Sequence, residues 1–237
     1  ALGGSSLVDQ TVIVGSQAGM GAMTAGADGT VALGYSALAV LTSGAGNLAI
    51  GYQAADAVST GDYNTAIGYQ ALSAEDTGDR NTAVGYSSLT NVNGANNNSN
   101  TGLGYNSGDV ITTGTNNTCL GANTDPSANS GANQTMVGAG VTGLADNSVV
   151  LGNSAVTDVY MAEDGFAKVN AGAMHISSST ADYSSTSASL HIEGSGSSVV
   201  EVDGTLGRLF SVTDEMSGSI FSANTIAGIP VIEATSA

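Results

Sequence analysis

The chain has 237 residues, of which 34 are Gly, and only 10% are charged: three Lys and Arg against 20 Asp and Glu, a formal net charge of −17. This balance excludes nucleic-acid binding through a basic patch and attraction to an anionic membrane surface. Because 41% of the residues are hydrophobic and regularly placed, the low charge does not indicate disorder. The single cysteine, Cys119, permits no disulfide within one chain and is expected to be a buried free thiol.

Residues 1–10 are read as a lead-in, and residues 11–155 carry a short pattern repeated nine times, with Asn64-Thr65-Ala66-Ile67-Gly68 as its cleanest copy. Each copy is anchored by a glycine: Gly15, Gly34, Gly51, Gly68, Gly85, Gly104, Gly121, Gly138 and Gly152. The steps between these glycines are 19, 17, 17, 17, 19, 17, 17 and 14 residues. A short fixed period predicts a solenoid of stacked coils, here a rod of about 40 Å at the usual strand spacing.

Two columns of the repeat are expected to face the inside of each coil. The residues one position before each glycine are all aliphatic, as at Ile50, Ile67 and Val84, and those three positions before it are β-branched except Leu48. Side chains alternate along a strand, so these columns share one face. The column between them is also apolar and is mainly small, with four Ala among its nine residues. We therefore expect the small residues to point outward and to be covered by another copy of the chain.

Polar and aromatic columns flank this strand. Asn47, Asn64 and Asn81 lie four residues before their glycines, where asparagine suits a coil corner and identical amides can bond as a ladder. Five tyrosines directly follow glycines: Tyr35, Tyr52, Tyr69, Tyr86 and Tyr105. Their regular spacing favours a stacked row that shields the coil corner, and the alternative is a sugar-binding strip.

The spacing of about 17 residues between anchor glycines does not continue after residue 155. Residues 156–190 are expected to hold short strands, near 158–161 and 167–169, and a Ser- and Thr-rich connector. Residues 191–237 carry glycines spaced by 10 or 11 residues, with short strands predicted at 199–202, 209–212, 220–223 and 230–233. Units of about 11 residues cannot close a core alone, so three chains are expected to form a triangular β-prism. No convincing helix is predicted.

The Asn-Thr-Ala-Ile-Gly core at residues 64–68, with variants at 47–51 and 81–85, resembles the head repeats of trimeric autotransporter adhesins. Those heads are trimers of parallel β-rolls, but the period of 17 and the Tyr after glycine depart from that family. The Gly-Tyr-Gln-Ala-Leu variety, together with residues 207–214 and 228–233, looks like phage tail-fibre and other virion fibre proteins. The resemblance implies an all-β homotrimer: a β-roll or β-solenoid of about nine coils, followed by a prism-like C-terminal part.

No catalytic, cofactor-binding or metal-binding residues are assigned. His175 and His191 are read as ordinary strand histidines, with a metal pair as the alternative. Asp62, Asp76 and Asp79 lie near coil corners, where cations could relieve their repulsion. The carboxylate pairs Glu75 with Asp76 and Glu163 with Asp164 are read as solvated turns rather than as a glycosidase pair. The polar insertion at residues 91–100 is read as a solvated loop, with a contact loop as the alternative.

The expected function is structural: a non-enzymatic tail-fibre protein of the virion that attaches to a host-surface glycan or protein by multivalent contact. Its expected partners are two further copies of itself, other fibre or virion proteins and the host surface, without nucleic acid or membrane insertion. The alternatives are a bacterial adhesin head or filament subunit that is extracellular or on the cell surface, and a tailspike-like glycan hydrolase.

Overall fold

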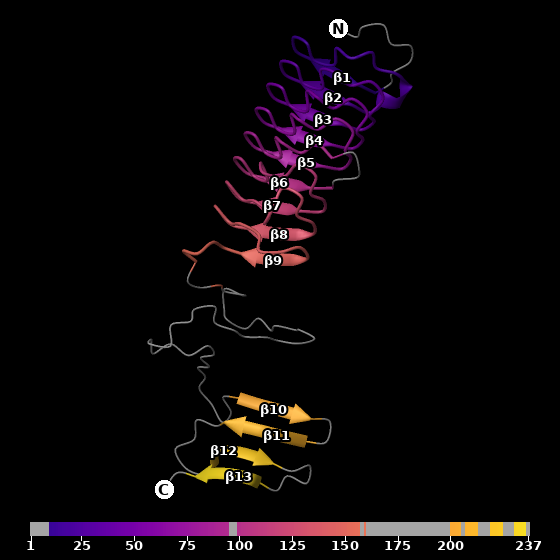
Figure 1. Cartoon of the computed structure of the whole chain (residues 1–237). Coiled ribbons are helices and arrows are strands. Elements are labelled where there is room, and N and C mark those ends of the chain that lie inside the picture. Colours follow the sequence, from indigo (N-terminus) through magenta and orange to yellow (C-terminus); the bar gives the residue numbers. More distant parts are fainter. Residues whose placement is uncertain are drawn as a thin grey trace. The chain divides into compact units, whose positions relative to one another are not determined.

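A computed structural model describes residues 10–94, 99–156 and 159, and the backbone of four strands between residues 200 and 235 (Figure 1). The chain divides into two compact units, Ala1–Gly165 and Phe166–Ala237. The two units are described separately. The predicted strands at 158–161 and 167–169, His175, His191, Glu163 and Asp164 lie outside the described residues.

The N-terminal unit contains one parallel sheet of nine strands, which follow each other in sequence order (Figure 1). The strands are β1 (Val12–Val14), β2 (Val31–Leu33), β3 (Leu48–Ile50), β4 (Thr65–Ile67), β5 (Thr82–Val84), β6 (Thr101–Leu103), β7 (Thr118–Leu120), β8 (Gln134–Val137) and β9 (Ser148–Leu151). Equivalent positions pair directly, so that Ile50 lies beside Ile67 and Ile67 beside Val84. The predicted parallel β-solenoid is therefore confirmed.

Hydrogen bonds between coils continue beyond the strands. The backbone N–H of Gln70 donates to the carbonyl of Tyr52 at 2.9 Å, and that of Tyr63 donates to the carbonyl of Ala45 at 2.8 Å. These bonds stack the turns of neighbouring coils as well as their strands. Among the described residues the only helical element is the 3-10 turn η1 (Ala25–Ala27), in agreement with the prediction of no substantial helix.

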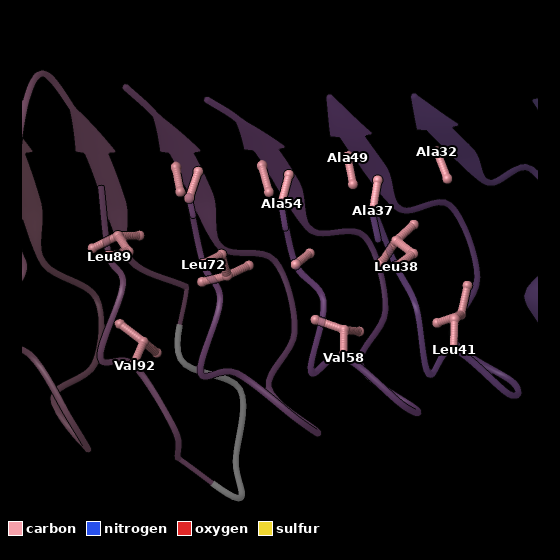
Figure 2. Packing of buried hydrophobic residues seen from close by; sticks show 14 of the residues in the cluster. Ala32, Ala37, Leu38, Leu41, Ala49, Ala54, Val58, Leu72, Leu89 and Val92 are labelled. Atoms are coloured by element: carbon pink, nitrogen blue, oxygen red, sulfur yellow. The ribbon is translucent and has the colours of Figure 1, made fainter. Parts of the chain in front are cut away.

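The core lies inside the coils, and the strand face that points into it is the opposite of the one expected from the sequence. Ala32, Ala49 and Ala66 are fully buried, and Figure 2 shows Ala32 and Ala49 pointing toward Leu38 and other residues of the opposite wall. The prediction that the small column points outward was wrong. The aliphatic column just before the glycines is the one that faces outward, as the intermediate exposure of Ile50 and Ile67 illustrates.

The narrow interior of each coil explains this reversal. Large side chains from the turns, including Leu38, Leu72 and Leu89, already fill the space opposite the strand (Figure 2). At Gly102, in the small column of β6, an added Cβ would lie 2.9 Å from Cγ of Leu89 and 2.5 Å from Oγ of Ser88. The middle strands therefore contribute small residues and the turns contribute the bulk, whereas the larger Ile13, Met136 and Val150 occupy the same inward column in β1, β8 and β9.

The C-terminal unit contains a four-stranded antiparallel sheet in sequence order (Figure 1). Its strands are β10 (Val200–Gly204), β11 (Gly207–Val212), β12 (Ser219–Asn224) and β13 (Pro230–Thr235). Each overlaps one of the strands predicted from the glycine spacing, and β10 begins one residue later than predicted. Register shifts between Val202 and Asp203 and along β12 give the meander local irregularities.

Candidate functional site

A continuous row of exposed aliphatic and threonine side chains runs along the outside of the parallel sheet. We call it the aliphatic stripe, and it consists of the residues one and three positions before the nine anchor glycines. Seven of its members expose between 41% and 67% of their surface: Val12, Val14, Leu33, Leu103, Leu120, Val149 and Leu151. Ile50, Ile67 and Val84, in the middle of the stripe, have intermediate exposure. The stripe contains no charged residue.

The anchor glycines hold the corner that ends each strand. All nine have a positive φ, between 81° and 142°, which side-chain-bearing residues rarely adopt. At Gly68 an added Cβ would also collide with the backbone carbonyl of Gly85 in the next coil. The repeat therefore demands glycine for both conformation and space, and the corner positions the stripe on one side and the tyrosines on the other.

The five tyrosines that follow glycines form a stacked ladder, as the structural interpretation of the sequence predicted. Consecutive ring centroids lie 5.0–5.3 Å apart, and the ring planes differ by 7–16°. The rings are partly exposed, yet each inner ring has its faces against its two neighbours. A sugar cannot stack on the face of a ring inside the ladder, so a strip of sugar sites along its whole length is not available.

The predicted asparagine ladder is present, but it lies in the buried interior. The side-chain oxygen of Asn47 accepts a bond from the backbone N–H of Asn64 at 2.8 Å, and that of Asn64 accepts one from Asn81 at 2.9 Å. The amide nitrogen of Asn64 donates to the carbonyl of Gly78 at 2.8 Å. The left-handed corner falls one residue earlier, at positions such as Tyr63 (φ 57°), so the asparagines satisfy buried backbone groups instead of adopting that conformation.

The aspartates near the coil corners bind backbone groups of neighbouring coils. Asp62 accepts a hydrogen bond from the N–H of Ala45 at 2.7 Å, and Asp79 accepts one from the N–H of Asp62 at 2.9 Å. Asp76 bonds to the hydroxyl of Ser59. In the described part of the chain no three His, Cys, Asp or Glu side chains gather in a way that could hold a metal ion. The suggested cation role at these corners therefore has no observation behind it.

Glu75 and Asp76 do not face a common site, because Glu75 is fully buried and Asp76 is exposed. The carboxylate of Glu75 accepts bonds from the N–H groups of Gly78 at 2.7 Å and Asp76 at 3.1 Å. Glu75 occupies the seventh position after its anchor glycine, which is Val58 in the preceding coil and Val92 in the next. A charged residue thus replaces an aliphatic one in a core column.

The structure brings together one acidic pair that sequence reasoning missed. The pKa of Asp125 is raised to about 6, mainly by burial and further by the neighbouring carboxyl of Asp109. A hydrogen bond from the N–H of Val110 acts in the opposite direction and lowers this pKa. Burial, with a smaller contribution from Asp125, also raises the pKa of the Cys119 thiol to about 12. The two aspartates occupy different positions in their coils, so the column alignment did not pair them. Cys119 is buried and free, as expected.

Two other sequence predictions can be followed only in part. Residues 95–98 of the polar insertion lie outside the described residues, and beside them Asn91 donates to the carbonyl of Asp109 at 2.6 Å. Within the described residues, no helix is long and apolar enough to cross a membrane.

The chain was compared with models of protein families, with characterised proteins and with solved structures, and none of them matches it.

Proposed function

We propose that the protein is a structural fibre protein that works as a homotrimer and attaches a virion to a host cell surface. The aliphatic stripe is the observation that carries this proposal. Contiguous apolar patches on monomeric proteins rarely exceed a few hundred Å². The seven most exposed aliphatic residues of the stripe expose 41–67% of their surface, and the partly exposed Ile50, Ile67 and Val84 lie between them on the same outer face.

A second copy of the same chain is the partner that fits the stripe best. Every copy carries the same apolar column at the same coil spacing, so two stripes match along their whole length. The stripe has no charge although the chain carries a net charge of −17. Identical chains can therefore meet there without bringing their carboxylates together, which repulsion would otherwise oppose.

The C-terminal unit also needs cover from further copies of the chain. Its described strands form a single four-stranded antiparallel layer. A single layer needs another layer to bury one face. Three such sheets around an axis would supply this cover as the sides of a triangular prism, and closed cyclic symmetry is the rule for assemblies of identical chains.

Attachment is the role proposed for the assembled rod. Nine coils stacked by continuous backbone hydrogen bonds make a stiff spacer. Three identical chains present every surface feature three times, which can raise the overall avidity by about 10²–10⁴ over one weak site. A neutral or protein receptor suits the acidic chain, because anionic partners would be repelled.

The proposal is tested by comparing wild-type protein with the stripe variant Ile50→Asp/Ile67→Asp on a panel of bacterial surface glycans and intact bacterial cells. The substituted side chains are partly exposed, so the solenoid should still fold, which circular dichroism can verify. We expect wild-type protein to be retained on at least one surface and the variant to lose at least about 100-fold in avidity. Retention on no surface, or equal retention of the variant, would contradict the proposal.

A further inference from the structure

The tyrosine ladder ends at Tyr105, and the next level of the stack holds a methyl group instead of a ring. Ala122 follows the next anchor glycine. The N–H of Asn123 donates to the carbonyl of Tyr105 at 2.8 Å, as the N–H of Asn106 does to Tyr86 at 2.9 Å, so the backbone stack continues past the last ring. One face of Tyr105 therefore has no aromatic neighbour.

This end of the ladder is also its loosest and most exposed part. Tyr105 exposes 52% of its surface, the highest value among the five rings. The pair Tyr86 and Tyr105 has the longest centroid distance, 5.3 Å, and the largest interplanar angle, 16°. At the other end Tyr35 exposes 41%, the same as Tyr69 inside the ladder. The two ends of the ladder are thus not equivalent.

Polar groups beside the two ends differ in the same way. In the column that follows the tyrosines, Ser36 donates to Gln17 at 2.9 Å, and Gln70 donates to Gln53 at 3.1 Å. Next to Tyr105 the same column holds Asn106 and Asn123. Within the described residues, the side-chain amides of these two asparagines make no hydrogen bond. Each amide offers a donor and an acceptor toward solvent.

We propose that the free face of Tyr105, with the amides of Asn106 and Asn123, is a binding subsite for a neutral pyranose sugar. The electron-rich face of an aromatic ring attracts the partly positive C–H groups on one face of a pyranose. An amide can donate to one hydroxyl of the sugar and accept from another. The net charge of −17 disfavours sialic acids and other anionic sugars. The biological meaning of this subsite rests on the proposed attachment function, whereas its chemistry does not require a trimer.

The test is a saturation-transfer NMR titration of the full-length protein with methyl β-D-galactopyranoside and methyl α-D-mannopyranoside. We expect wild-type protein to bind at least one of them, with a millimolar dissociation constant typical of one small site. Tyr105→Ala removes the ring and should weaken binding about tenfold or more. Ala122→Met leaves Tyr105 in place, covers its free face and should weaken binding similarly. Tyr35→Ala, at the less exposed end of the ladder, is the matched control and should bind like wild type.

Three results would overturn the subsite: no binding of either sugar to wild-type protein, unchanged binding by Ala122→Met, or equal loss in Tyr35→Ala. Circular dichroism on each variant verifies that the solenoid is folded. This test can fail independently of the proposed function. A monomer that binds the sugar would contradict the trimeric fibre and leave the subsite supported. A trimer that attaches to cells but binds neither sugar defeats only the subsite.

Discussion

Glu75 is a carboxylate at a core position that is aliphatic in the neighbouring coils. Its carboxylate is fully buried in a column that is otherwise aliphatic, and it is bonded to two backbone N–H groups. Burying a carboxylate is expensive, but removing one partner of a buried hydrogen bond leaves the other unsatisfied, which costs about 1–3 kcal/mol.

We predict that Glu75→Val, which copies Val58 of the preceding coil, lowers the free energy of unfolding at pH 7 by about 1–3 kcal/mol, because the buried N–H of Gly78 loses its acceptor. Chemical denaturation followed by circular dichroism measures this difference. Glu75→Gln is the control, because it removes the charge and keeps an acceptor for Gly78. A Glu75→Val protein at least as stable as wild type would mean that the cost of burying the carboxylate outweighs its backbone hydrogen bonds.

The pair Asp109 and Asp125 predicts a pH dependence of stability. The pKa of Asp125 is about 6 in the folded protein, above its ordinary value of 3.8, so between these pH values the folded state holds more protons than the unfolded state. The free energy of unfolding should therefore fall as the pH rises through this window. Allowing for partial exposure, we expect a fall on the order of 1 kcal/mol from this group.

Asp125→Asn should remove this fall, which urea unfolding of both proteins at pH 4 to 7 measures. Asp146 is the control of opposite sign, because hydrogen bonds from Ala132 and Gln134 lower its pKa. Asp146 therefore adds to the free energy of unfolding at pH values above its ordinary pKa of 3.8, and this stabilisation is lost as the pH falls. If wild type and Asp125→Asn have parallel pH profiles, the carboxyl of Asp125 is not held as described.

At the scale of the strand, the inward face should not tolerate larger side chains, whereas the outward face should. Ala66 points into a coil interior filled by turn leucines, whereas Ile67 lies on the outer stripe. We predict that Ala66→Leu destabilises the protein by about 3 kcal/mol, because overpacking a tight core costs at least 1–3 kcal/mol. Ile67→Leu, one residue away, should change stability by less than about 1 kcal/mol. Thermal unfolding compares the two, and equal losses would contradict the assigned faces.

The elements themselves were predictable, because the period, the glycine corners and the β-branched columns all signal the same short strands. The direction of the faces was not, since Ala66 and Ile67 are both apolar and hydrophobic pattern alone cannot choose between them. Side-chain volume favours the observed direction in the middle coils, because each of these coils of about 17 residues already holds a turn leucine such as Leu72 and has little space for a second large side chain. The pairing of Asp109 with Asp125 depends on how different turns fold and has no signal in the columns.

At the scale of the whole molecule, the reversed faces change the reason for assembly. The outer surface expected from the sequence was a column of mainly small residues that would let backbones approach closely. The observed outer surface is a row of Ile, Leu, Val and Thr, which removes more apolar area from water when it is covered. The side chains that support a homotrimer are therefore those of the aliphatic stripe, whereas the sequence had suggested the small residues between them.

The mass of the intact chain in solution, measured by light scattering over a range of concentrations, tests this account most directly. We predict a mass near three times 23.1 kDa for wild-type protein. Ile67→Asp, on the stripe, should shift the mass toward one chain, and Tyr63→Asp, at an exposed aromatic residue outside the stripe, should leave the trimer intact. A wild-type mass of 23.1 kDa at every concentration would contradict the account, because the stripe would then be exposed to water in the working protein.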